Sequence, residues 1–119
     1  MAPRDESFAD RLSRVNEITL KVTGRNSGKL IALPVWFVWD NQTLYLLPVH
    51  GSETQWYKNV LKNPSIRIEI GDSETKFTVF PLTSASEVSP VIEKFRGKYG
   101  ASGMKYYSKL DVAVIVKTL

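Results

Sequence analysis

A basic, glycine-containing turn is the segment of this chain best suited to binding chemistry. In it Arg25 and Lys29 flank Asn26, Ser27 and Gly28. Phosphate groups are bound by this mixture, because Arg and Lys give charge-assisted hydrogen bonds and a turn exposes backbone N–H groups. The alternative is a solvated hairpin turn whose charges only aid solubility. The spacing does not match a nucleoside-triphosphate P-loop, so that class of site is not expected.

A second candidate anion site lies at a predicted helix start. Ser52, followed three residues later by Gln55, matches a capping box and predicts a helix that begins at Ser52. The free N–H groups and the dipole at such a start attract anions. His50 is either an ordinary loop residue or part of this site. Trp56 is either a core residue or a wall for a planar ligand.

Three tyrosines gather near the end of the sequence. Tyr99, Tyr106 and Tyr107 flank the glycine-containing segment 100–103. The segment therefore fits either a lid over a pocket or simple packing of the last loop against the sheet.

Composition excludes most side-chain catalysis. The chain has no cysteine and one histidine, His50. A disulfide, a thiolate metal site, a cysteine nucleophile and a histidine-rich metal site are therefore not expected. No Gly-x-Ser-x-Gly elbow frames a serine nucleophile. We predict no catalytic side chain and no metal, so the difficult chemistry belongs to a bound cofactor.

Length and charge narrow the class of protein further. The 119 residues are expected to form one domain, 1–119, and the net charge of +4 favours anionic partners. Basic and acidic residues are interleaved, so a nucleic-acid interface is not expected. No apolar run is long enough to span a membrane, and the first residues do not resemble a signal peptide. A cytoplasmic location is the resulting expectation.

The pattern of apolar residues predicts six strands and three short helices. Residues 18–23 and 65–70 alternate between apolar and polar types, as half-buried strands do. Residues 30–39 are apolar almost throughout, which predicts a strand covered on both faces, although Pro34 indicates an edge or a bulge. The expected strands are 18–23, 30–39, 43–49, 65–70, 76–82 and 110–116, and the expected helices are 6–15 (within an N-terminal helical region 1–16), 52–62, and one from 84 to 97 or 100.

Turn signals join these strands into hairpins. Asp40-Asn41 and Gly71-Asp72 each predict a tight turn, and Ser84 with Glu87 predicts a capped helix. Closure of the sheet into a small barrel would remove exposed strand edges. The predicted fold class is mainly β (α+β), a barrel of about six antiparallel strands with three short helices.

Taken together, the motifs resemble the deazaflavin-dependent nitroreductase family. This family is a branch of the split-barrel flavoproteins, which include pyridoxamine-phosphate-oxidase-like proteins. The similarity runs from about Ile18 to the end and rests on the order of the motifs at 23–28, 34–37, 40 and 56–64. It implies a split β-barrel that uses coenzyme F420. The implied reaction is hydride transfer from the reduced cofactor to a small electron-poor acceptor such as a quinone, nitro compound or enone.

The resemblance also implies the site residues. The basic turn would meet the phosphate and acidic tail, the segments 34–37 and 47–49 would line the ring, and the 50–52 turn with Trp56 would close the groove. The implied cofactor-binding residues are Arg25, Asn26, Ser27, Lys29, Pro34, Val35, Trp36, Phe37, Leu47, Pro48, Val49, His50, Gly51, Ser52 and Trp56. Tyr99, Tyr106 and Tyr107 are implied to contact the acceptor.

Departures from the family pattern keep other functions open. Asn26 stands where a Lys is usual and Ile31 where an Arg is usual, while Lys29 partly compensates. Each charged hydrogen bond is worth about 1.5–3 kcal/mol, so these changes weaken the grip on a polyanionic tail. FMN has one phosphate and needs fewer cations, so an FMN-binding oxidoreductase is the first alternative. A non-catalytic carrier of a flavin or hydrophobic ligand is the second. The resemblance leaves two assemblies open: a homodimer, because split barrels often build the cofactor groove between subunits, and a monomer.

Overall fold

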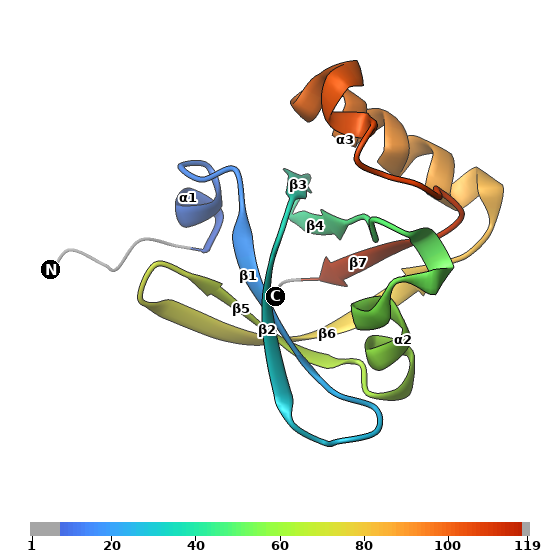
Figure 1. Ribbon diagram of the computed structural model, residues 1–119. Helices are drawn as coiled ribbons and strands as arrows, with labels where there is room; N and C mark the ends of the chain where they lie inside the picture. The colour runs from blue at the N-terminus through green and yellow to red at the C-terminus, as the bar shows by residue number, and fades with distance from the viewer. Residues whose placement is uncertain (1–7, 118–119) are drawn as a thin grey trace, which may run out of the picture.

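The structure, a computed structural model, describes residues 8–117. This part of the chain forms one curled sheet of seven antiparallel strands with three α-helices around it (Figure 1). The strands are β1 (Ile18–Thr23), β2 (Leu30–Val35), β3 (Phe37–Asp40), β4 (Thr43–Leu46), β5 (Ser65–Ile70), β6 (Ser73–Leu82) and β7 (Ala113–Lys117). The helices are α1 (Phe8–Leu12), the 3-10 turn η1 (Gly51–Glu53), α2 (Gln55–Lys62) and α3 (Ala85–Met104). The predicted mainly β, split-barrel class is confirmed.

The inner face of the sheet is the core, and strand alternation builds it. In β1 the side chains of Ile18, Leu20 and Val22 are buried while their neighbours are half-exposed. Ile66 and Ile68 of β5 do the same. The apolar face of α2 covers one end of this core, and α2 packs chiefly on β1. Burial of these side chains stabilises the barrel, since each fully buried Leu or Ile contributes roughly 1.5–3 kcal/mol.

The predicted strand 30–39 is wrong as a single element. It divides at Trp36 into β2, which pairs with β1, and β3, which pairs with β4. The order β2-β1-β5-β6-β7-β4-β3 puts these two consecutive strands at opposite edges of the sheet. Strand β2 is not covered on both faces either, because Leu30 and Ile31 are 50% and 42% exposed. The edge position that Pro34 indicated is confirmed, and the division raises the strand count to seven.

The predicted hairpins and one predicted cap are confirmed. The hairpin turn between β3 and β4 lies at Asn41 and Gln42, one residue later than the predicted Asp40-Asn41, and both residues have the positive φ that a two-residue turn requires. Gly71, with φ of 62°, opens the turn between β5 and β6. At the start of α3, the Glu87 N–H donates to the Ser84 hydroxyl oxygen at 3.3 Å.

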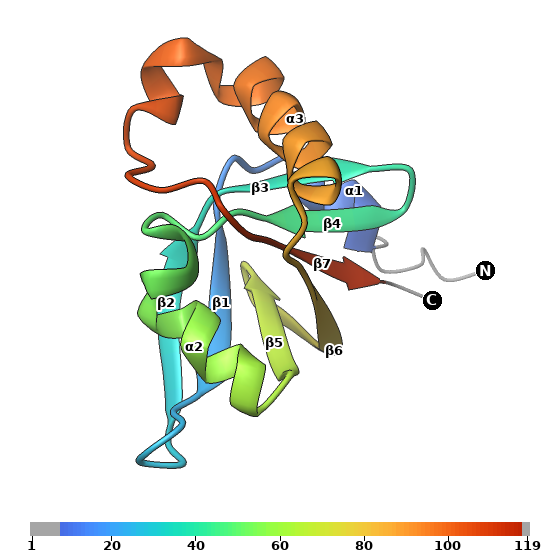
Figure 2. The same cartoon turned by 90° about the vertical axis from the view of Figure 1, so that its right-hand side faces the viewer.

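Several element boundaries differ from the predictions. The first helix is shorter than 6–15, and Glu6 lies outside the described residues. Strand β4 ends before Val49, β6 begins before residue 76, and β7 begins after residue 110. Helix α3 bends at Gly100, whose φ is 76° and ψ 170°. Figure 2 shows α3 above β3 and β4, where its buried face meets Val38 and Leu47.

Candidate cofactor site

A largely apolar cavity of about 390 Å³ lies where the chain passes from β2 to β3. Its volume falls in the range of small-ligand pockets, and such pockets are mostly apolar with a few polar groups. The lining residues are Glu17, Leu33, Pro34, Val35, Trp36, Leu47, Val49, Thr54, Trp56, Tyr106 and Tyr107. The cavity therefore depends on the division at Trp36 that the sequence did not reveal.

Trp36 is the wall residue that α3 holds most closely. Its indole stacks on the ring of Tyr99, with centroids 4.2 Å apart and an interplanar angle of 7°. The rings of Tyr106 and Tyr107 meet it edge-on at 5.7 and 6.2 Å. An added Cβ on Gly103 would lie 3.2 Å from the indole. Aromatic contacts of this kind contribute about 0.5–1.5 kcal/mol each beyond area burial, so the indole is firmly positioned.

Tyr99 supports this wall from behind and does not line the cavity. Its hydroxyl accepts a hydrogen bond from the Phe37 N–H at 3.1 Å. The same oxygen lies 2.9 Å from the carbonyl oxygens of Asn16 and Phe37, either of which can accept its proton. Burial raises the pKa of the Tyr99 phenol and, more strongly, that of Tyr107. Of the three tyrosines implied to contact the acceptor, Tyr106 and Tyr107 reach the cavity.

Arg25 in the basic turn is engaged by helix α2. Its guanidinium donates to the side-chain oxygens of Asn59 and Gln55, both at 2.8 Å, and its backbone N–H donates to Asn59 at 3.1 Å. Asn59 is 5% exposed, so it is a buried acceptor that Arg25 satisfies. The arginine thus ties the turn to α2, and only its remaining N–H groups are available to an anion.

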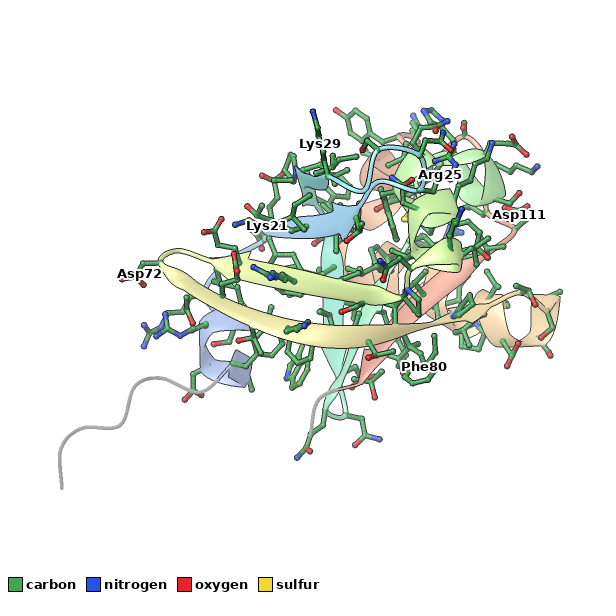
Figure 3. The ribbon with its side chains drawn as sticks, turned by 90° about the horizontal axis from the view of Figure 1, so that it is seen from below. Lys21, Arg25, Lys29, Asp72, Phe80 and Asp111 are labelled. Carbon is green, nitrogen blue, oxygen red and sulfur yellow. The ribbon has the colours of Figure 1, made fainter. Side chains whose placement is uncertain are left out.

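Lys29 is the cation in this turn that is free to meet a ligand. Figure 3 shows its side chain pointing away from the body of the molecule, whereas Arg25 lies against α2. No described residue forms an ion pair or hydrogen bond with its ammonium group. The backbone N–H of Lys29 donates to the Ser27 hydroxyl oxygen at 3.1 Å, and Gly28 has the positive φ of 71° that closes the turn. Asn26 is exposed in the same turn.

The capping box predicted at Ser52 is wrong. Residues 51–53 form the 3-10 turn η1, and α2 begins at Gln55 after an extended Thr54. The Thr54 hydroxyl accepts from the His50 N–H at 2.8 Å, which holds Thr54 outside the helix. The donors of Ser52 are already used, since its N–H and hydroxyl donate to the two carboxylate oxygens of Asp111 at 2.9 and 2.6 Å.

The segment 108–111, between α3 and β7, is fastened to the segment 49–52. The hydrogen bond from the Ser52 hydroxyl lowers the pKa of Asp111. The hydrogen bond from the Ser52 N–H and the positive charge of Lys109 lower it further. The Ser108 N–H donates to the Val49 carbonyl oxygen at 2.8 Å, and the Ser108 hydroxyl lies 2.7 Å from His50 Nδ1. This fastening holds the wall residue Val49 close to the chain that carries the two cavity tyrosines.

The structure gathers eight of the implied site residues around one cavity. These are Pro34, Val35, Trp36, Leu47, Val49, Trp56, Tyr106 and Tyr107. Arg25, Asn26, Ser27, Lys29, Phe37, Pro48, His50, Gly51, Ser52 and Tyr99 do not line it. Glu17, Leu33 and Thr54 line it although the sequence did not single them out. The sequence signal that could have identified Glu17 is its position just before the alternating residues 18–23.

Comparison with known proteins decides the family. The family model for F420H2-dependent quinone reductases matches residues 4–118. The chain belongs to this family. Membership makes this protein an F420H2-dependent reductase with coenzyme F420 as its cofactor, and it agrees with the resemblance in the sequence. Among curated proteins, none matches the chain significantly.

Solved structures share the fold of this reductase at low sequence identity. An F420H2-dependent reductase, FDR-A, is 22% identical with a TM-score of 0.66, covering 86% of this chain and 94% of that one. A pyridoxamine 5′-phosphate oxidase candidate from Listeria innocua is 19% identical with a TM-score of 0.67, covering 92% and 88%. A protein solved as a domain-swapped dimer is 22% identical with a TM-score of 0.62, covering 86% and 80%. Along residues 8–117 of the reductase, no helix has the length and apolar character needed to cross a membrane.

Proposed function

We propose that this F420H2-dependent reductase passes a hydride to a small, planar, electron-poor acceptor such as a quinone, nitro compound or enone. The observation that carries the proposal is the aromatic-walled cavity between Trp36, Trp56, Tyr106 and Tyr107. A planar ring is well matched to such walls. No side chain is assigned a bond-making role, since the cofactor supplies the hydride chemistry.

The cavity and the basic turn would hold two different parts of the cofactor. The apolar walls, including Val35 and Leu47, would hold the ring and exclude water from it. Lys29, with the free N–H groups of Arg25, would meet the phosphate and the acidic tail. Ser52 contributes indirectly, because Asp111 already occupies its donors. The chain's contribution to rate is then to hold two reactants in contact in a dry site.

A direct binding comparison tests this proposal. Purified protein is titrated with oxidised F420 and, separately, with FMN, and the fluorescence of the cofactor is followed. Tighter binding of F420, followed by reduction of menadione or a nitroarene by F420H2, is the expected result. Preference for FMN would move the protein to the FMN-binding alternative. Cofactor binding with no reduction of any acceptor would favour the carrier.

A homodimer is proposed as the assembled form. The edge strand β2 exposes the apolar side chains of Leu30 and Ile31 next to unpaired backbone groups, and such an edge is a ready site for pairing. One structural neighbour is itself a domain-swapped dimer. The mass of the wild type and that of Leu30→Lys, both measured by light scattering, test this. Equal masses for the two proteins would argue against pairing through β2. The expected single domain and cytoplasmic location stay predictions.

A further inference from the structure

Among the described residues that line the cavity, Glu17 alone carries a formal charge. Every other lining residue is apolar, aromatic or uncharged. None of the described residues lies within hydrogen-bond or ion-pair distance of the Glu17 carboxylate. The side chain is exposed to solvent, and the residue before it is fixed, because the Asn16 carbonyl oxygen lies 2.9 Å from the Tyr99 hydroxyl. An unpaired carboxylate at the rim of an apolar pocket is available to a ligand.

The charges of the β1–β2 hairpin have opposite signs at its two ends. Ile18, next to Glu17, pairs with Val35, while Thr23 pairs with Leu30, next to Lys29. The five residue steps between these pairs span about 17 Å along the strand. A polyanionic tail is therefore drawn towards Lys29 and repelled from Glu17. This polarity leaves the Glu17 end of the cavity to the acceptor.

The cavity walls next to this carboxylate are aromatic. Trp36, Trp56, Tyr106 and Tyr107 all reach the cavity, and no Lys or Arg does. Organic cations are held by aromatic faces through cation–π attraction, best of all by Trp. A carboxylate beside such walls adds direct charge attraction, which acts against anionic ligands.

From these observations we propose that the acceptor end of the cavity selects planar organic cations, namely N-alkylated aromatic heterocycles. The proposal rests on the proposed reductase function and specifies its acceptor. The electron balance suits this class: the acceptor cation gains two electrons and one hydrogen nucleus as a hydride at a ring carbon. One C–H bond of the reduced cofactor would break as one C–H bond forms on the acceptor, one ring double bond shifts to the nitrogen as a lone pair, and the product is neutral. The cofactor, in returning to its oxidised form, would release one proton to solvent. No proton donor is then needed from the chain, whereas a quinone also requires a proton.

The charge of the product gives this selection a second effect. A neutral product loses both the attraction of Glu17 and the cation–π attraction of the walls. The reduced acceptor should therefore bind more weakly, and dissociate faster, than the oxidised acceptor. Quinones lack this change, because both their oxidised form and their hydroquinone are neutral.

The test measures three acceptors of different charge with the wild type and with variants that each lack one carboxylate. The acceptors are the 10-methylacridinium cation, neutral menadione and anionic 1,4-naphthoquinone-2-sulfonate, each reduced by F420H2 after subtraction of the uncatalysed rate. The variants are Glu17→Gln and, as matched control, Glu93→Gln. Glu93 is an exposed carboxylate on α3 that lies outside the cavity, so its loss changes net charge equally.

We expect the ratio of kcat/KM for the cation to that for menadione to fall about fivefold in Glu17→Gln and to stay the same in Glu93→Gln. The fall should shrink at high salt, because Glu17 is solvent-exposed. The ratio of kcat/KM for the anion to that for menadione should rise in Glu17→Gln. Equal changes in both variants, or a wild type that reduces the anion as well as the cation, would overturn the proposal.

A binding measurement without cofactor keeps this inference separable from the proposed function. The fluorescence of 10-methylacridinium is titrated with the protein alone, and the Kd should rise about fivefold in Glu17→Gln only. Failure of F420H2 to support reduction of any acceptor would count against the reductase proposal, while this titration still decides the cation site. No difference in Kd between Glu17→Gln and Glu93→Gln would overturn the cation site even if menadione is reduced.

Discussion

Tyr99 stacks almost parallel on Trp36, although it lies 63 positions later in the chain, and its hydroxyl bonds to the backbone next to two residues that line the cavity. One bond reaches Phe37, directly after Trp36, and another reaches Asn16, directly before Glu17. The position of the aromatic wall and that of the rim carboxylate therefore depend on one phenol. The tyrosine acts on the site through these neighbours, since it does not line the cavity itself.

Removal of that hydroxyl should loosen both anchors. Tyr99→Phe keeps the ring that stacks on Trp36 but leaves the Phe37 N–H without its acceptor. A buried donor left unpaired costs about 1–3 kcal/mol, and we expect a loss of unfolding free energy in that range. Urea denaturation measures it. The control is Tyr106→Phe, since Tyr106 is 71% exposed and its change should stay within about 0.5 kcal/mol. A Tyr99→Phe variant as stable as the wild type would show that the hydroxyl bonds are not structural.

The two cations of the basic turn should behave differently when replaced. Arg25→Ala removes three guanidinium bonds to α2 and should lower the unfolding free energy by about 1–2 kcal/mol as well as weakening F420 binding. Lys29→Ala should weaken F420 binding about fivefold and leave stability within about 0.5 kcal/mol. Thermal denaturation and fluorescence titration separate the two effects. Lys62→Ala, an exposed cation at the end of α2, is the control for net charge. Unchanged F420 affinity in Lys29→Ala would mean that the turn only joins two strands.

The bond between Ser52 and Asp111 should make part of the stability depend on pH. Because the folded-state pKa of Asp111 is lowered, its contribution is present above the unfolded value of about 3.9 and is lost as pH falls through the folded pKa. Wild type should therefore lose more thermal stability than Asp111→Asn between pH 7 and pH 3. Asp72→Asn changes a fully exposed carboxylate and should follow the wild type. Parallel pH profiles for wild type and Asp111→Asn would contradict this assignment.

Two glycines should respond oppositely to alanine. Gly51 has a positive φ of 56°, and a Cβ there would lie 2.1 Å from Asp111 Oδ1. Gly51→Ala should cost at least about 2 kcal/mol, from backbone strain and displacement of the carboxylate. Gly97 lies within α3 with no atom near its would-be Cβ, so Gly97→Ala should stabilise by about 0.5–1 kcal/mol. Urea denaturation of both variants checks the pair, and a neutral Gly51→Ala would show that the turn can rearrange.

The sequence predicted those features that neighbouring residues determine. Alternation in residues 18–23 and 65–70, the Gly71 turn and the Ser84 cap are local signals, and the structure has all of them. The same local signals predicted the mainly β barrel, and the family resemblance supplied the split-barrel type and the cofactor, which the family match bears out.

The missed features depend on contacts between distant segments. The division at Trp36 has no local signal, because apolar residues lie on both sides of it and the partner that holds it is Tyr99. The capping box at Ser52 failed because the Ser52 hydroxyl bonds to Asp111 on a distant segment and α2 begins only at Gln55. Arg25 appeared free in the sequence for the same reason, since its partner Asn59 lies on another element. Glu17 was missed because the cavity wall is assembled from segments that lie far apart in the sequence.

The position of β7 constrains how the protein can be made. This strand is the last in sequence among the described elements, yet it lies between β6 and β4 and joins the two parts of the sheet. The hairpins β1–β2, β3–β4 and β5–β6 can each form while the chain is still being synthesised. They cannot close around a common core until residues 113–117 have left the ribosome. Until then the edges of β4 and β6 that β7 covers stay unpaired, and unpaired strand edges make a folding chain prone to aggregation.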